Sequence, residues 1–133
     1  MKVEGGCHCG RISFEADVDP EAVGVCHCTD CQNLTGSALR ANVQAPAAGF
    51  VLHGEPKTYL KTAESGRKRV HAFCPECGTP IYATSVETPT SYSLRIGTLR
   101  QRAQLGQPKL QLWTRSALPW VYELASVPKR DKQ

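Results

Sequence analysis

The chain has 133 residues, of which 41% are hydrophobic and 21% are charged, and its formal net charge is +4. This length and composition predict one globular domain, and the absence of a long apolar run argues against a membrane-spanning helix. The first six residues contain no apolar segment of the kind that forms a secretory signal peptide, so we expect a cytoplasmic protein whose thiols stay reduced.

Many short strand patterns separated by Gly and Pro predict a mainly β fold with little helix. The clearest pattern covers residues 11–18, where polar residues alternate with the apolar residues Ile12, Phe14, Ala16 and Val18. A short helical turn is expected at residues 30–34, ending near Gly36. Further strands are expected at residues 37–44, 50–53, 58–61, 69–73 and 79–85 and around residues 92–96, with a loop at residues 45–49.

The C-terminal part of the chain is harder to assign. Pro119 lacks a backbone donor, so residues 117–120 are not expected in a helix interior. The apolar residues Leu110, Leu112 and Val121 are predicted to lie in the core. No repeat or linker divides the sequence, and we therefore expect a single domain over residues 1–133 with a frayed C-terminal tail.

All seven cysteines lie in three short clusters, which are Cys7-His8-Cys9, Cys26-His27-Cys28-Thr29-Asp30-Cys31 and Cys74-Pro75-Glu76-Cys77. Seven thiols are one too many for a single four-ligand metal site and one too few for two closed sites. The number therefore predicts one closed site with four thiolates and a second site with three. A zinc site with an open position is typical of a catalytic metal.

The pair Cys74 and Cys77 is the strongest single signal in the sequence. Its two-residue spacing on a turn, followed by Gly78, fits a zinc knuckle at the tip of a β-hairpin. A redox Cys-X-X-Cys pair usually opens a helix, and Pro80 argues against one here. The knuckle needs two more ligands, and spacing alone leaves two sources open: Cys7 with Cys9, or two of the three cysteines between residues 26 and 31.

The four histidines are not expected to bind metal. His8 and His27 each lie between two cysteines, and a side chain flanked by two ligands projects in a different direction from both. His53 and His71 have no metal-ligand spacing, so they are expected to be partly buried or surface residues.

Several of these segments together resemble the signature of the Gfa family, the glutathione-dependent formaldehyde-activating enzymes, whose domain also occurs in centromere protein V. The resemblance rests on Gly5-Gly6-Cys7-His8-Cys9-Gly10, Cys26-His27-Cys28-Thr29-Asp30-Cys31, Cys74-Pro75-Glu76-Cys77-Gly78 and Ser116-Ala117-Leu118-Pro119-Trp120. It covers roughly residues 3–123, which we take as the core of the single domain. It implies a small zinc-stabilised antiparallel β fold with two Zn²⁺ ions per chain. The implied ligands are Cys7, Cys9, Cys74 and Cys77 for a structural zinc and Cys26, Cys28 and Cys31 for a catalytic zinc.

The resemblance also implies a function, that of a carbon–sulfur lyase-type enzyme. The family's named reaction joins glutathione and formaldehyde to give S-hydroxymethylglutathione. We therefore expect a small thiol, glutathione or a similar compound, as the partner, and neither nucleic acid nor a membrane. Binding the carboxylates of glutathione requires donors such as cations, for which the candidates are Arg40, Arg67, Lys68, Arg69, Arg95 and Arg115. Trp113 and Trp120 are candidates for a pocket wall, with core packing expected for at least one of them.

Two other functions are compatible with the same residues. A non-catalytic two-zinc interaction module that binds nucleic acid would use the basic groups at residues 67–69 and 129–132. However, seven thiolates and two Zn²⁺ ions would lower the formal charge from +4 to +1, so these groups are expected to be solvated loop and tail residues. Redox sensing by Cys26, Cys28 and Cys31 is the third alternative.

Overall fold

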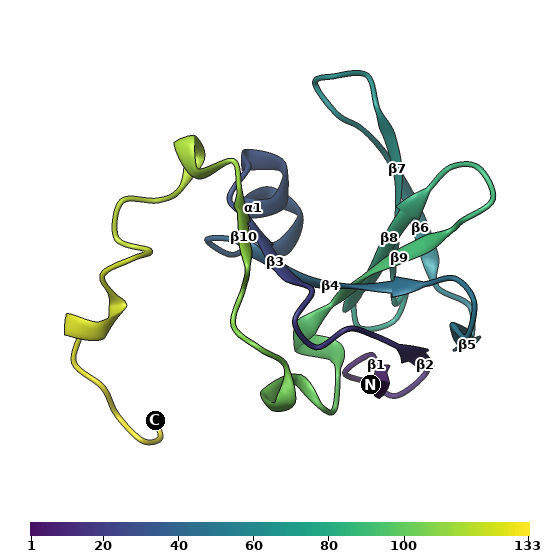
Figure 1. The fold of residues 1–133 in the computed structure, drawn as a ribbon, viewed down its shortest axis with the longest axis horizontal. Helices are drawn as coiled ribbons and strands as arrows, with labels where there is room; N and C mark the ends of the chain where they lie inside the picture. The colour runs from purple at the N-terminus through teal and green to yellow at the C-terminus, as the bar shows by residue number, and fades with distance from the viewer.

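A computed structural model describes residues 1–133 as two β-sheets, one α-helix and four short 3₁₀ turns (Figure 1). The smaller sheet consists of β1 (Lys2–Gly6), β2 (Ser13–Asp17) and β5 (Val51–His53) in that order. The larger sheet consists, in spatial order, of β10 (Leu110–Leu112), β3 (Val23–Cys26), β4 (Arg40–Pro46), β9 (Ser91–Arg95), β8 (Pro80–Ser85), β7 (Lys68–Phe73) and β6 (Lys57–Thr62). The strands pair antiparallel except for β10, which runs parallel to β3. The predicted mainly β fold with little helix is confirmed.

The core lies between the two sheets. Successive side chains of a strand point to opposite faces, and the strand register places Val43, Leu94, Tyr82 and Ala72 of the larger sheet on one face. These residues belong to the same buried cluster as Phe14 of the smaller sheet. The alternation predicted for residues 11–18 is confirmed, because the four apolar side chains are all at least 96% buried: Ile12, Phe14, Ala16 and Val18.

The opposite face of the larger sheet is polar, and it carries the three-cysteine loop. In the strand register Cys26 pairs with Arg40, and Asn42 pairs with Arg95. His71 pairs with Ala83, which pairs with Ser93, two positions before Arg95. Opposed residues share a face, so a cysteine at the end of β3 and polar side chains of β4, β9 and β7 all project from one surface.

The helix α1 (Thr29–Thr35) follows β3 directly and confirms the helical turn expected near residues 30–34. It ends at Gly36, whose φ of 61° is a left-handed conformation that glycine adopts without steric cost. None of the helices has the length and apolar character that spanning a bilayer requires.

Strand β4 differs from the prediction at both ends. It begins at Arg40 rather than residue 37 and continues to Pro46, through part of the expected loop. The reason is that Ala45 is fully buried opposite Tyr92, which extends the pairing with β9. The two strands on either side of the turn at residues 54–56 also lie in different sheets, since β5 pairs with β2 and β6 pairs with β7.

The predicted core positions near the C-terminus are wrong. Leu110 and Leu112 are 59% and 50% exposed because β10 is an edge strand, and Val121 is only partly buried. Trp113 and Trp120 are also about half exposed, so the expected core packing of a tryptophan is wrong as well. After β10 the chain runs away from the sheets and forms no further strand (Figure 1).

Candidate metal centres

Cys74 and Cys77 lie at the tip of the β7–β8 hairpin, as the sequence predicts. The backbone N–H of Cys74 donates to the carbonyl of Thr79 over 2.9 Å, and the N–H of Gly78 donates to the carbonyl of Cys74 over 2.9 Å. Gly78 has a φ of 76°, which favours glycine at this position. These bonds close a tight turn that holds both sulfurs at one end of the hairpin.

The loop that follows β1 brings two more thiols to this turn. The Sγ atoms of Cys7 and Cys9 are 3.6 Å apart, and those of Cys9 and Cys74 are 3.7 Å apart. All four sulfurs, including that of Cys77, lie within 4.8 Å of one another. Zinc–sulfur bonds of about 2.3 Å in a tetrahedron require sulfurs about 3.8 Å apart. The group therefore fits a tetrahedral metal ion. Of the two donor pairs that spacing left open, Cys7 and Cys9 are the pair beside the knuckle.

Hydrogen-bond donors favour the thiolate form of two cysteines in this four-cysteine cluster, Cys77 and Cys7. In Cys9, by contrast, a backbone hydrogen bond at Arg11 is outweighed by desolvation and the neighbouring thiols, which raise its pKa to about 12. The Oγ1 of Thr79 lies 3.2 Å from the Sγ of Cys77, and this hydrogen bond is the main cause that lowers the pKa of Cys77 to about 5. The N–H of Ile12 donates to the Sγ of Cys7 over 3.2 Å. Thiolates are the form that binds metal ions.

The second cluster is built at the junction of β3 and α1. Cys26 ends the strand, Cys28 is the N-cap of the helix, and Cys31 lies in its first turn. The three Sγ atoms lie within 4.8 Å of one another, and no fourth Cys, His, Asp or Glu joins the group. The N–H of Cys31 donates to the Sγ of Cys28 over 3.3 Å. The three-cysteine cluster can therefore hold a metal ion and leave one tetrahedral position open.

His27 points away from these sulfurs, as expected from its place between Cys26 and Cys28. Its side chain is 1% exposed, and its Nε2 lies 2.8 Å from the Oε1 of Gln111 on the neighbouring strand β10. The Nε2 of Gln32 donates to the carbonyls of His27 and Ser116 over 2.8 and 2.9 Å. The segment that contains β10 thus fixes the backbone of the three-cysteine cluster.

The thiols of this cluster differ in acidity. Burial raises the pKa of Cys31 to about 12, although the positive charge of Arg40 acts in the opposite direction. Burial also acts to raise the pKa of Cys28, but hydrogen bonds from the backbone and sulfur of Cys31, together with other neighbours, lower it overall. A divalent cation between the sulfurs would favour all three thiolates, because metal-bound thiols lose their protons.

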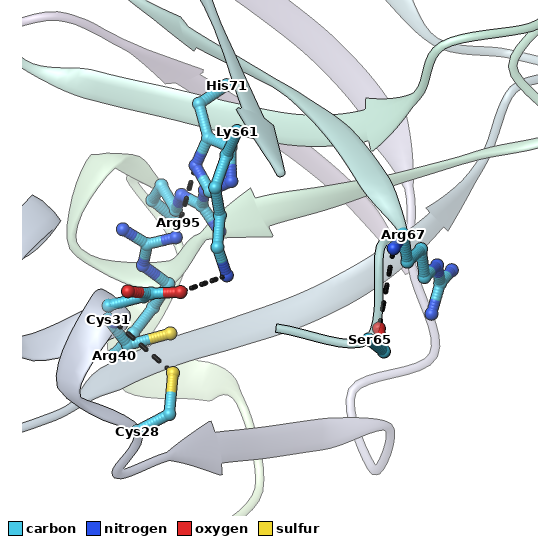
Figure 2. Close-up of polar contacts among 9 residues, drawn as sticks. Cys28, Cys31, Arg40, Lys61, Ser65, Arg67, His71 and Arg95 are labelled. Carbon is cyan, nitrogen blue, oxygen red and sulfur yellow. Dashed lines mark hydrogen bonds and ion pairs between the residues drawn. The ribbon is translucent and has the colours of Figure 1, made fainter. Parts of the chain in front are cut away.

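Beside the three-cysteine cluster lies a group of buried cations that the sequence could not place. Arg40 and Arg95 are 5% and 7% exposed. Nη1 of Arg40 and Nη2 of Arg95 lie 3.3 and 3.1 Å from the Nδ1 of His71, towards which both side chains extend (Figure 2). Burial, followed by the charges of Arg95 and Arg40, lowers the pKa of His71 to about 3. The imidazole is therefore neutral and accepts from both guanidinium groups.

A further cation joins the helix to the far edge of the sheet. The Nζ of Lys61 on β6 lies 3.0 Å from the Oδ2 of Asp30 in α1. The Nη2 of Arg69 donates to the Oγ of Ser93 over 3.3 Å on the same face. Figure 2 shows Lys61 directed towards the cysteines and Arg40.

The other candidate cations lie elsewhere. Arg67, Lys68 and Arg115 are exposed, and Figure 2 shows Arg67 directed away from the cysteines. The basic groups at residues 67–69 and 129–132 lie at opposite ends of the molecule (Figure 1). They therefore do not form one continuous basic surface.

A cavity of about 500 Å³ lies between the loop after β1 and the start of β4. Its lining includes Cys7 and Thr79 from the knuckle region, Thr35 from the end of α1, and both Arg40 and Arg95. The volume is within the usual range of sites for small molecules, which is about 300–1,000 Å³.

Comparison with known proteins connects these clusters to one family. The family model described as "Glutathione-dependent formaldehyde-activating enzyme" matches residues 2–116. A Halomonas elongata protein named "Putative glutathione-dependent formaldehyde-activating enzyme" is 28% identical over 97 residues, in an alignment that covers 67% of this chain and 60% of that protein. The chain thus aligns with less than two thirds of the length of this relative.

A solved structure shows a similar fold. The crystal structure of a Rhodobacter sphaeroides protein matches with a TM-score of 0.61 and 19% sequence identity. The match covers 81% of this chain and 98% of the other chain. At this identity the similarity concerns the arrangement of the strands.

Proposed function

Because the chain belongs to the family of glutathione-dependent formaldehyde-activating enzymes, we propose that it is a zinc-dependent carbon–sulfur lyase-type enzyme that acts on a thiol and an aldehyde. The proposed reaction is the reversible addition of glutathione, or a similar small thiol, to formaldehyde. The thiol gives up its proton and its sulfur forms a bond to the aldehyde carbon. An electron pair of the C=O bond moves to oxygen, and oxygen takes up a proton, so no proton is gained or lost overall. The product with glutathione is S-hydroxymethylglutathione.

The observation that carries this proposal is that the chain has one group of four thiols, enough to fill a tetrahedral metal site, and a second group of three, which leaves one position open. Cys7, Cys9, Cys74 and Cys77 form a group of four sulfurs, whereas the second group has only three. His27, which could have been a fourth ligand, instead bonds to Gln111. An open position on a metal ion is what a catalytic site needs and a purely structural site lacks.

We assign the metal ligands accordingly. Cys7, Cys9, Cys74 and Cys77 would hold one Zn²⁺, which joins the N-terminal loop to the β7–β8 hairpin. Cys26, Cys28 and Cys31 would hold a second Zn²⁺. When bound there, this ion would supply positive charge that stabilises the deprotonated form of a substrate thiol at neutral pH.

The surrounding residues position the three-cysteine cluster. The N–H of Cys31 orients the sulfur of Cys28 by a 3.3 Å hydrogen bond. The ion pair between Lys61 and Asp30 holds α1 against β6, and Gln32 ties the loop to residue 116. These contacts keep the three sulfurs on the polar face of the larger sheet, beside the buried Arg40 and Arg95.

The test follows the exchange between free formaldehyde and S-hydroxymethylglutathione by NMR, with ¹³C-labelled formaldehyde and zinc-loaded protein. Wild-type protein is expected to accelerate the exchange over the uncatalysed rate. Cys28→Ser should abolish the acceleration and reduce the zinc content from two ions to one. The control His53→Ala, an exposed position on β5, should behave like wild type. Wild-type protein with two zinc ions and no acceleration for glutathione or other small thiols would overturn the proposal.

A further inference from the structure

The last strand of the larger sheet and the segment that follows it carry most of the exposed apolar side chains. Of the twelve large apolar residues that are exposed in this chain, seven lie within residues 110–127. Single exposed apolar residues are ordinary on a protein surface, whereas a concentration of them marks an interaction site. We call these seven residues, each 50–59% exposed, the apolar arm: Leu110, Leu112, Trp113, Trp120, Tyr122, Leu124 and Val127.

The fold of the chain itself does not cover the apolar arm. Beyond β10 the chain forms two 3₁₀ turns, η3 (Thr114–Ser116) and η4 (Leu124–Ser126), and no strand. Its backbone hydrogen bonds in this segment are local, such as the one from Val121 to Leu118 over 3.0 Å. Figure 1 shows the segment outside the β10 edge of the larger sheet. About half of each arm side chain is therefore open to solvent.

Two contacts fix the arm against the rest of the chain. The Nε2 of Gln32 donates to the carbonyl of Ser116 over 2.9 Å, and the ring centroids of His27 and Tyr122 lie 5.8 Å apart. Because His27 is buried, Tyr122 packs against the body of the molecule while much of its own ring stays exposed. The arm is thus held in place before it meets a partner, which lowers the entropy cost of association.

The charges of the arm exclude some classes of partner. Residues 110–127 contain only two charged side chains, Arg115 and Glu123, and these have opposite signs. A nucleic acid or an acidic membrane surface requires a cluster of cations, which this segment lacks. Two copies of the segment can meet without net repulsion, and the cores of protein interfaces are depleted of charged residues. The composition therefore favours a second copy of this chain.

The apolar area of the arm is what one side of a dimer needs. Aromatic side chains have roughly 150–250 Å² of surface, so seven large apolar side chains at about half exposure present on the order of 600 Å². A standard interface buries about 800 Å² on each partner, and about 65% of a homodimer interface is apolar. Such an interface requires roughly 500 Å² of apolar surface from each chain, which the arm supplies.

We propose that this chain forms a symmetric dimer in which the apolar arm of one copy packs against the apolar arm of the other. In a two-fold symmetric interface both copies use the same surface, so the arm needs no complementary surface elsewhere on the molecule. Trp113 and Trp120 are the expected anchors, because buried tryptophans contribute strongly to interface energies. None of the seven cysteines belongs to the arm, so the dimer stands independently of the proposed function.

Sedimentation and tryptophan fluorescence, measured over one concentration series of the zinc-loaded protein, test the dimer and its location together. In the micromolar range the mass is expected to approach twice the 14.5 kDa of one chain. Both tryptophans of the chain belong to the arm, so their emission reports on this surface alone. The emission should shift to shorter wavelength in step with the mass, because the second copy displaces water from the rings.

Substitutions at exposed positions locate the interface. Trp120→Ser should raise the dimer dissociation constant at least about 30-fold, which is the effect of removing a hot-spot residue. Leu124→Ser should raise it by a smaller factor, and it decides the result if circular dichroism shows that Trp120→Ser does not fold. Tyr59→Ser is the matched control, because Tyr59 is 53% exposed on β6 at the opposite edge of the larger sheet. It should leave the dissociation constant unchanged.

The existence of the dimer and its location can each be refuted. Wild type that stays monomeric throughout the micromolar range would overturn the proposal, even if the monomer binds to phospholipid vesicles. A dimer whose tryptophan emission does not change with concentration would place the interface on another surface. The same conclusion follows if folded Trp120→Ser and Leu124→Ser dimerise as tightly as wild type. An equal loss of dimer in Tyr59→Ser would show that the effect is not specific to the arm and would also overturn the proposal.

Discussion

The Nε2 of His27 lies 2.8 Å from the Oε1 of Gln111. His27 is the residue between Cys26 and Cys28, so this contact ties the three-cysteine cluster to the edge strand β10. The imidazole is 1% exposed, and its Nδ1 has no partner. Gln111 therefore supplies the one hydrogen bond of a fully buried ring. The contact also explains how a strand of three residues with exposed side chains contributes to the site.

Substitution Gln111→Leu should destabilise the protein by about 1–3 kcal/mol, because it leaves both nitrogens of a buried imidazole unpaired. Chemical denaturation of the zinc-loaded protein measures this free energy. Gln107→Leu is the matched control, since it changes an exposed glutamine outside any helix or strand and should alter stability by less than about 0.5 kcal/mol. Equal effects of the two substitutions would show that the His27 contact does not stabilise the fold.

The two cysteine clusters should respond differently to loss of one ligand. Cys74→Ser removes a buried sulfur that joins the N-terminal loop to the β7–β8 hairpin. We expect loss of one zinc ion and a large fall in thermal stability, because structural zinc sites supply about 10–16 kcal/mol of apparent binding free energy. Cys28→Ser should also lose one zinc ion but keep a cooperative unfolding transition, since its loop is held by Gln32, Gln111 and Lys61.

Metal analysis and differential scanning calorimetry on the same samples check this difference. His8→Ala is the control, because His8 is exposed between two cysteines and should leave two zinc ions per chain. An unaltered melting temperature in Cys74→Ser would contradict the structural assignment of the four-cysteine cluster.

Local patterns in the sequence were enough to predict much of this fold. Alternation at residues 11–18 predicted a half-buried strand, and the Cys74–Cys77 spacing predicted a hairpin tip; both are confirmed. Long-range pairing could not be predicted in the same way. Spacing left open whether Cys7 lies beside the knuckle, since that depends on where the loop after β1 packs.

Arg40 and Arg95 were among six candidate cations in the sequence, and only the structure singles them out, for a physical reason. Arg40 and Arg95 lie on strands, where a charged residue is normally directed to solvent, and nothing local marks them as buried. Only the strand register places Arg40 opposite Cys26 and Arg95 opposite Asn42. The wrong core assignment of Leu110 and Leu112 has a related cause, because apolar residues on a short edge strand remain exposed.

His71 should make the stability of the protein depend on pH. Burial and the facing charges of Arg95, Arg40, Lys61 and Arg69 lower its pKa from 6.5 to about 3. The unfolded chain therefore binds a proton at a higher pH than the folded chain does. The contribution of His71 to stability is fully present above pH 6.5 and is lost progressively as the pH falls from 6.5 towards 3.

Denaturation of wild type and His71→Asn between pH 7 and pH 4 measures this contribution. Asparagine keeps an acceptor oxygen but does not titrate, so the variant should gain stability relative to wild type as the pH falls. The relative gain should stay below the limit of about 1.4 kcal/mol per pH unit, because the ring is only half-buried and solvent screens its neighbours. Parallel curves for the two proteins would contradict the shifted pKa.

Because Gly5 in β1 is closely packed, adding a single methyl group there should destabilise the smaller sheet. A Cβ atom at Gly5 would overlap the Cζ of Phe14, a ring that is 1% exposed in the core. We expect Gly5→Ala to destabilise the protein by about 1–3 kcal/mol. Gly97→Ala meets no atom within 4 Å and should have a much smaller effect in the same denaturation experiment. A tolerated Gly5→Ala would show that the ring can move.

The central claim is that Cys26, Cys28 and Cys31 hold a metal ion with a position open to a substrate thiol. Replacement of zinc by Co²⁺ tests it directly, because sulfur ligands give cobalt an intense charge-transfer absorption. Glutathione should increase this absorption in wild-type protein by the contribution of one additional thiolate per chain, and Cys28→Ser should show no increase. A wild-type spectrum that does not change at saturating glutathione would contradict the claim.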